Sequence, residues 1–280
     1  MATTSTRRRR GRLLLIGGNE DMDERDMRIL PRLVELAGGK KSRILVCAAA
    51  SAEPERSLEA FNRDLGKLGA GEVFQSPLNS REEADSDELI DMLERSTAVL
   101  LTGGDQLRAT SMMAGTRFGD RLKEGYQRHG LFVAGTSAGA ACMSSTMIIR
   151  GIGDTVRRDA VELAPGLGFL RNITVDTHFD RGGRVHRLMT VLAQNPATLG
   201  VGIDEDTAAE ISANRKLTVW GKGVVIVFDG RAIHTNAAEV SGREAMALTG
   251  VKVHVLPQGY GFDLKTLTPI IPGAASASAA

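Results

Sequence analysis

The chain has 280 residues, of which 42% are hydrophobic and 25% are charged. These values are ordinary for a folded globular protein and exclude disordered, collagen-like and coiled-coil chains. The 35 basic and 34 acidic residues leave a formal net charge of +1, so no overall field attracts nucleic acid or a membrane surface. We therefore predict neither nucleic-acid binding nor membrane association.

The first twelve residues form a basic arm that contains five arginines. The apolar run Leu13–Ile16 that follows is too short for the apolar core of a signal peptide, and no run approaches the length of a membrane span. We predict that residues 1–12 are disordered and solvated. Cys47 and Cys142 are predicted to be reduced and buried, and we expect a cytoplasmic location.

Short apolar runs alternate with helical patterns from residue 13 to residue 203. The predicted strands are Leu13–Ile16, Ile44–Cys47, Val73–Phe74, Ala98–Leu101, Leu131–Ala134, Ile173–Val175 and Leu199–Ile203. Apolar residues recur with helical periodicity over Asp26–Ala37, Ser57–Leu68 and Asp87–Glu94. Strands that alternate with helices predict the α/β class, with a mostly parallel sheet flanked by helices on both faces.

The pattern changes after about Thr207, where short strands are separated by turn signals. These predicted strands are Ala208–Ile211, Leu217–Trp220, Gly223–Phe228 and Val251–Leu256. We expect them to be antiparallel, and either to extend one edge of the sheet or to form a small second sheet. Residues 272–280 have nothing large to bury and are predicted to be disordered. The prediction is a single α/β domain over residues 13–271 with a β-rich C-terminal portion.

The clearest local signal is Gly-x-Ser-x-Gly at residues 135–139, directly after an apolar strand and before small helix-forming residues. This is the pattern of a nucleophile elbow, in which a sharp turn exposes the serine hydroxyl at the carboxyl edge of a sheet. Glycines are needed there because neighbouring backbone passes close to the turn. We interpret Ser137 as a nucleophile.

A serine nucleophile needs a general base, for which the chain has five histidines. His178 follows the predicted strand Asn172–Asp176 and so lies at a carboxyl end, where active sites of α/β proteins gather. His186 falls in a predicted helix and has the alternative interpretation of a surface residue. We interpret His178 as the base.

The base needs an orienting acid, and three consecutive acids, Asp204, Glu205 and Asp206, follow the strand Leu199–Ile203. Such a run is usually a solvated turn, and the pattern does not choose among the three. The order serine, histidine, acid differs from that of α/β-hydrolases, so we expect a different fold with the same chemistry.

A second glycine turn, Gly103-Gly104, follows the predicted strand Ala98–Leu101. It lacks the spacing of a P-loop and of a dinucleotide site, so nucleotide binding is poorly supported. Its N–H groups would complete an oxyanion hole with the N–H of Ala138.

Residues able to bind a metal also lie near one another in the sequence, namely Asp176, His178, Asp180 and His186. They are not accompanied by an HExxH pattern or by paired cysteines and histidines. We therefore predict no metal and no cofactor.

Seven segments together carry a family resemblance that covers nearly the whole chain. They are Ile16–Asp21, Leu101–Arg108, Gly135–Ala140, Ala164–Phe169, Asp176–Phe179, Gly202–Thr207 and Gly259–Leu264. In this order they resemble the cyanophycinases, serine peptidases related to the dipeptidase E group. The resemblance implies a flavodoxin-like sheet, similar to that of class I amidotransferases, a homodimer, and a catalytic triad of Ser137, His178 and Glu205.

The resemblance also implies a substrate. Cyanophycin is an aspartate backbone with arginine in isopeptide linkage, so its enzyme needs acids for the guanidinium groups and bases for the carboxylates. Arg181, Arg184 and Arg187 are three residues apart, which predicts one helix face. The predicted substrate-binding residues are Asp105, Gln106, Asp176, Thr177, Arg181, Arg184 and Arg187.

One position departs from the family pattern, which places arginines four, six and nine residues after the histidine. The corresponding residues are Gly182, Arg184 and Arg187, so the first arginine is missing, and Arg181 lies one residue early. Our hypothesis is a serine exopeptidase that hydrolyses cyanophycin to β-Asp-Arg dipeptides through an acyl-enzyme. The alternatives are an isoaspartyl or α-aspartyl dipeptidase of the same fold and a catalytically silent binding homologue.

Overall fold

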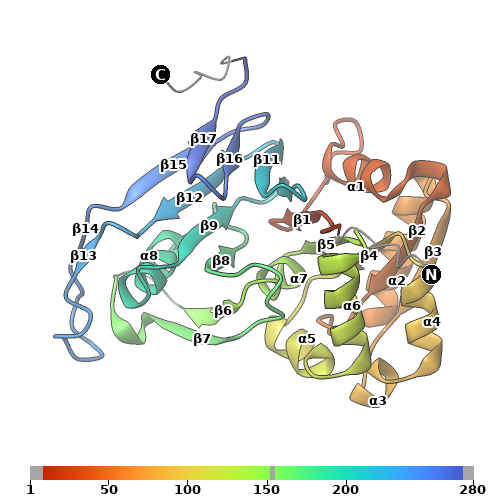
Figure 1. The fold of residues 1–280 in the computed structure, drawn as a ribbon, viewed down its shortest axis with the longest axis horizontal. Coiled ribbons are helices and arrows are strands. Elements are labelled where there is room, and N and C mark those ends of the chain that lie inside the picture. The colour runs from red at the N-terminus through yellow and green to blue at the C-terminus, as the bar shows by residue number, and fades with distance from the viewer. Residues whose placement is uncertain (1–8, 152–154, 274–280) are drawn as a thin grey trace, which may run out of the picture.

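The computed structural model describes residues 9–151 and 155–273 of the chain. The helix-rich N-terminal part and the later, β-rich part occupy opposite sides of the ribbon (Figure 1). Residues 1–8 of the predicted arm and 274–280 of the predicted tail lie outside the described residues.

A nine-stranded sheet in the order β17-β16-β11-β10-β1-β5-β4-β2-β3 forms the centre of the fold. Its parallel strands are β1 (Leu13–Ile16), β2 (Arg43–Cys47), β3 (Glu72–Ser76), β4 (Ala98–Leu101) and β5 (Phe132–Thr136). Antiparallel strands extend it beyond β1, namely β10 (Thr207–Ile211), β11 (Lys216–Gly221), β16 (Gly261–Asp263) and β17 (Thr268–Ile270). The predicted α/β class with a β-rich C-terminal portion is confirmed.

Helices cover both faces of the parallel strands. They are α1 (Ile29–Ala37), α2 (Pro54–Lys67), α3 (Arg81–Ala84), α4 (Asp87–Arg95), α5 (Gln106–Met113), α6 (Arg117–Arg128) and α7 (Ala138–Ala141), with a 3₁₀ turn at Gly39–Lys41. A further helix, α8 (Arg184–Gln194), packs against Ile173–Asp176 and Leu199–Ile203 instead and contacts a 3₁₀ turn at Arg158–Ala160. In β1, Leu13 and Leu15 face a core shared with α4 and α6, whereas Leu14 and Ile16 face a core shared with α1 and α2. Burial on both faces explains why this strand is a continuous apolar run.

A second sheet, in the order β15-β12-β9-β8, stands beside the first. Its strands are β8 (Ile173–Asp176), β9 (Leu199–Ile203), β12 (Val225–Asp229) and β15 (Lys252–Leu256), and only β8 and β9 are parallel. The expectation that β8 and β9 continue the main parallel sheet is wrong, because β1 already pairs with β5 on one side and with β10 on the other. The later strands both extend the main sheet and complete the second one.

Two hairpins project from these sheets. One pairs β6 (Thr146–Gly151) with β7 (Val161–Pro165), and the other pairs β13 (His234–Thr235) with β14 (Leu248–Thr249). The first lies between β5 and β8 in the sequence and leads the chain from the main sheet to the second.

The described part of the basic arm contacts the body of the protein. The N–H of Arg9 donates to the carbonyl of Arg128 at 3.1 Å, and the N–H of Gly11 donates to that of Tyr126 at 2.6 Å. Arg12 pairs with Glu210 at 2.9 Å. The chain is therefore held from Arg9 onward, and the extent of a single domain over residues 13–271 stays a prediction.

Cys47 and Cys142 are free and buried, as predicted. Burial raises the pKa of each thiol to about 12, which keeps both protonated at neutral pH. Among the described residues, no helix combines the length and apolar character needed to cross a bilayer.

Candidate active site

Three consecutive carbonyl groups at the end of β1 bind the segments that carry the predicted triad. The carbonyl of Ile16 accepts the N–H of Ser137, that of Gly17 accepts the N–H of His178, and that of Gly18 accepts the N–H of Asp206, each at 2.9 Å. The loops after β5, β8 and β9 therefore meet at one edge of the molecule, although they come from two sheets.

Ser137 lies on the sharp turn between β5 and α7. Its backbone has φ 51° and ψ −115°, a conformation that a residue with a side chain rarely adopts. An added Cβ on Gly135 would stand 2.3 Å from the carbonyl oxygen of Gly139, and one on Gly139 would stand 2.2 Å from that of Leu101. Both glycines are therefore required by close backbone contacts, as the elbow pattern predicts.

The side chains of Ser137, His178 and Glu205 form a continuous hydrogen-bonded chain. The Oγ of Ser137 lies 2.8 Å from Nε2 of His178, and Nδ1 of His178 lies 2.7 Å from Oε1 of Glu205. An imidazole with its proton on Nδ1 donates to Glu205 and accepts the serine proton at Nε2. This is the arrangement that activates a serine for acyl transfer.

The two neighbouring acids face other groups. Asp204 accepts the N–H of Val224 at 3.0 Å, and Asp206 accepts the N–H of Asp21 at 2.8 Å and pairs with Lys222. Successive side chains of the run point in different directions, so only Glu205 contacts the imidazole.

Arg181 binds the same carboxylate of Glu205 that contacts the histidine. Its Nε donates to Oε1 at 3.0 Å, and its Nη2 donates to Oε2. Arg181, together with a hydrogen bond from Asn19, lowers the pKa of Glu205 to about 2. The expectation that Arg181 shares a helix face with the other two arginines is wrong, because α8 begins only at Arg184. Arg181 thus contacts the acid of the hydrogen-bonded chain.

Arg184 and Arg187 both bind Asp176, which is buried with 2% of its surface exposed. The Nε of Arg187 donates to Oδ2 at 2.6 Å, and Nη1 of Arg184 donates to Oδ1 at 3.3 Å and to the carbonyl of Thr177 at 2.6 Å. Asp176, Arg184 and Arg187, all predicted to bind substrate, lie together near His178. In this structure the two arginines are paired with Asp176. Asp176 and His178 were considered together as possible metal ligands. Asp176 binds the two arginines, whereas His178 contacts Ser137 and Glu205.

Asp105 and Gln106 serve the local structure of the second glycine turn. Asp105 caps α5 by accepting the N–H groups of Leu107 and Arg108 at 2.8 and 3.1 Å. The amide of Gln106 donates to the carbonyls of Ile148 and Ile149 at 2.6 and 3.1 Å. Neither side chain is directed by these bonds toward Ser137.

Two of the predicted oxyanion donors, Gly103 and Ala138, lie close to the nucleophile. An added Cβ on Gly103 would stand 3.4 Å from Cβ of Ser137, and Ala138 is the next residue after the serine. Within the described part of the chain, the N–H groups of Gly103, Gly104 and Ala138 donate to no acceptor. They are free to bind a developing oxyanion.

A pocket of about 390 Å³ opens beside Ser137 and His178. One wall is Glu20, whose Oε2 accepts the hydroxyl of Thr136 at 2.8 Å. Burial raises the pKa of this carboxyl above its ordinary value. Sequence reasoning assigned Glu20 no role, although its position just after β1, at the same edge as Ser137, was an available signal.

The chain belongs to peptidase family S51, whose family model matches residues 13–219. It is a serine peptidase, and the predicted resemblance to cyanophycinases is confirmed. It is 34% identical to the cyanophycinase of Geminocystis herdmanii (strain PCC 6308) over 263 residues, which cover 93% of this chain and 96% of that protein. It is 35% identical to the cyanophycinase of Trichormus variabilis (strain ATCC 29413 / PCC 7937) over 263 residues, or 92% and 88% of the two chains.

Two solved structures share the fold. The crystal structure of a peptidase from an acI-B1 Actinobacterium aligns with a TM-score of 0.62 and 22% identity, covering 89% of this chain and 98% of that one. A putative peptidase E protein from Listeria monocytogenes EGD-e aligns with a TM-score of 0.51 and 18% identity, covering 75% and 97%. At these identities the likeness concerns the fold.

The contact between Gly18 and the imidazole gives a first prediction. An added Cβ on Gly18, whose φ is +104°, would stand 2.2 Å from Cε1 and 2.6 Å from Nε2 of His178. We expect Gly18→Ala to displace the ring and to lower kcat/KM for peptide hydrolysis about 100-fold, as measured by steady-state kinetics. Gly182→Ala is the control, since nothing lies within 4 Å of its added Cβ. Full activity of Gly18→Ala would show that the ring position is not critical.

The Arg181–Glu205 pair predicts a pH dependence of stability. With its pKa lowered to about 2, Glu205 stabilises the folded state above the pKa of an unfolded glutamate, and this stabilisation is lost as the pH falls toward 2. We expect Arg181→Gln to raise that pKa, so that the variant loses less stability than the wild type between pH 5.5 and about 3. Urea unfolding at the two pH values tests this, with Arg243→Gln as the surface control. Equal losses in the wild type and Arg181→Gln would contradict the assignment.

Proposed function

We propose that this peptidase hydrolyses cyanophycin and releases β-Asp-Arg dipeptides, with Ser137 as nucleophile, His178 as general base and Glu205 as the residue that orients the imidazole. The observation that carries the proposal is the hydrogen-bonded chain of 2.8 and 2.7 Å through these three side chains. Relatives named cyanophycinase, 34–35% identical over 92–93% of the chain, support the substrate. A homodimer and a cytoplasmic location stay predictions.

The chemistry follows from the positions of the atoms. Oγ of Ser137 attacks the scissile carbonyl while its proton passes to Nε2 of His178, and Glu205 stabilises the imidazolium that forms. The N–H groups of Ala138 and of Gly103 or Gly104 bind the tetrahedral oxyanion. The C–N bond then breaks, and the leaving amine takes the proton from Nε2. Water attacks the ester in the same way, releases the dipeptide and restores the serine.

The pocket beside Ser137 suits a cationic side chain on an apolar stem. Its walls include the carboxylates of Glu20 and Asp64 and the apolar side chains of Leu30 and Phe61. Within the described residues, the carboxyl of Glu20 accepts from the hydroxyl of Thr136 and from its own backbone N–H. A carboxylate has about four lone-pair sites, so it retains acceptor capacity for a guanidinium. We assign the arginyl side chain of the substrate to this pocket.

The carboxylate of the substrate is assigned to Arg184 and Arg187. Both are bound to Asp176, but a guanidinium has five N–H donors and neither arginine uses all of them there. A substrate carboxylate can therefore bind without displacing Asp176, whose charge keeps the two like-charged groups together.

Replacement of the nucleophile is the direct test. We expect Ser137→Ala to lower kcat on purified cyanophycin by at least about 1,000-fold, while the melting temperature and polymer binding stay near wild type. Mass analysis of the products identifies β-Asp-Arg, and Ser144→Ala, a buried serine that does not contact His178, checks for nonspecific loss. Wild-type dipeptide release by Ser137→Ala would rule out the proposed mechanism.

The proposed role of Glu20 in binding the guanidinium is tested by removing its charge. Glu20→Gln removes the negative charge and keeps an oxygen that accepts from Thr136, so we expect kcat/KM for an arginyl substrate to fall roughly tenfold or more. A substrate with neutral citrulline in place of arginine should be hydrolysed about equally by both proteins. Equal losses on the two substrates would mean that Glu20 acts on the chemical step instead.

An isoaspartyl or α-aspartyl dipeptidase is the second candidate, and Gly182 favours it. This residue stands where the family pattern has an arginine, and an added Cβ there meets nothing within 4 Å. Turnover of polymer and of isolated dipeptides by the same preparation separates the two. Hydrolysis of dipeptides alone would replace the first proposal with the second.

A further inference from the structure

A pocket of about 400 Å³ lies at the edge of the molecule opposite Ser137, and four arginines line it. Arg10 precedes β1, Arg128 ends α6 before β5, and Arg215 lies in the turn between β10 and β11. Because β1 and β5 are parallel and β10 is antiparallel to both, these three positions all lie at the starting end of β1 and β5. Arg171, just before β8, completes the set.

Three of these guanidinium groups have no hydrogen-bond or ion-pair partner within residues 9–151 and 155–273. The side chains of Arg10, Arg171 and Arg215 make no hydrogen bond or ion pair with any described residue, and Arg128 pairs with Glu124 at 3.3 Å. The pocket has no Asp or Glu among the described residues that line it. A chain whose formal net charge is +1 therefore concentrates like charges at one place, where they repel one another.

The backbone holds the arginines in place. Hydrogen bonds from Arg9 and Gly11 to the carbonyls at the end of α6 fix the chain on both sides of Arg10. The N–H of Arg215 donates to Ser212 at 2.8 Å, and its carbonyl accepts the N–H of Leu264 at 2.9 Å. The backbone at Arg10 and Arg215 is thus held before any ligand arrives, and only the side chains have to be ordered on binding.

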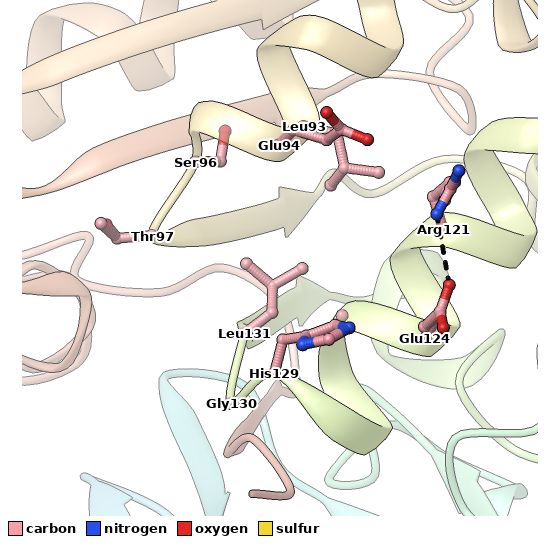
Figure 2. Close-up of a pocket in the computed structure, with 10 residues that line it drawn as sticks. Leu93, Glu94, Ser96, Thr97, Arg121, Glu124, His129, Gly130 and Leu131 are labelled. Carbon is pink, nitrogen blue, oxygen red and sulfur yellow. Dashed lines mark hydrogen bonds and ion pairs between the residues drawn. The ribbon is translucent and has the colours of Figure 1, made fainter. Parts of the chain in front are cut away.

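The end of α6 does not by itself explain the cluster. The last turn of a helix attracts positive charge, which accounts for Arg128, but Arg171 and Arg215 come from other elements. A neighbouring pocket of about 480 Å³, also lined by the end of α6, has a different composition. Figure 2 shows that its walls carry both signs of charge and that Arg121 and Glu124 pair there. The Nη1 of Arg121 lies 3.5 Å from Oε2 of Glu124.

We propose that the four-arginine pocket binds a polyvalent oxyanion, such as linked phosphates or clustered carboxylates, at a site separate from the peptidase centre. Guanidinium groups bind such oxygens through paired, charge-assisted hydrogen bonds. Several negative charges are needed to compensate four arginines, so a monovalent anion does not satisfy the site. The buried aromatic residues Tyr126 and Phe169 also line this pocket.

Isothermal titration of the full-length protein with sodium tripolyphosphate, and separately with citrate, tests the proposal. We expect binding of one anion per chain that weakens between 50 and 200 mM salt, because salt screens the charges. Binding of tripolyphosphate alone identifies phosphate as the ligand chemistry, and binding of citrate alone identifies carboxylate. Binding of neither anion up to 10 mM would overturn the proposal.

The variants locate the site. Arg171→Gln and Arg215→Gln should each weaken binding about tenfold, whereas Arg243→Gln, an exposed arginine outside the pocket, should leave it unchanged. Unchanged peptidase activity of all three verifies that they are folded. Wild-type affinity in both pocket variants would show that the anion binds elsewhere and would refute the assignment.

Discussion

The site depends on three successive carbonyl groups, those of Ile16, Gly17 and Gly18. Each accepts an N–H at 2.9 Å, from Ser137, His178 and Asp206 respectively. Because Asp206 adjoins Glu205, one short segment at the end of β1 positions all three members of the proposed triad. It thereby connects loops from the two sheets at the site.

The strain in these loops is consistent with that constraint. Ser137, His178 and Asp206 all have positive φ values, of 51°, 49° and 49°, which residues with side chains seldom adopt. Such conformations persist when surrounding hydrogen bonds and packing enforce them. The same loops carry opposite charges in contact, since Arg181 binds Glu205 and Arg184 and Arg187 bind Asp176. The site thus presents both signs of charge, as does the proposed substrate.

Much of the fold could be predicted from local patterns, and the site only in part. The continuous apolar run Leu13–Ile16 predicts a buried strand, because hydrophobic cores cover both of its faces. Gly-x-Ser-x-Gly predicts the elbow, because close backbone contacts leave no room for a Cβ at the two glycines. The pairing of β8 with β9 in a separate sheet was not predictable, because it depends on β10 occupying the free edge of β1.

Local sequence patterns also did not predict which groups the charged residues bind. The spacing of Arg181, Arg184 and Arg187 predicts one helix face, but α8 begins at Arg184 and leaves Arg181 in the preceding turn, in contact with Glu205. The choice of Glu205 over Asp204 and Asp206 came from family resemblance, because periodicity does not show which side chain of a turn faces inward.

The most direct measurement of the central claim is the rate at which a fluorophosphonate probe labels the protein. If His178 activates Ser137 through the observed hydrogen bond, the probe should label Ser137 rapidly, and His178→Gln should slow labelling by about 1,000-fold or more. Peptide mapping by mass spectrometry locates the modified residue. Labelling of His178→Gln at the wild-type rate, or of a different residue, would contradict the mechanism.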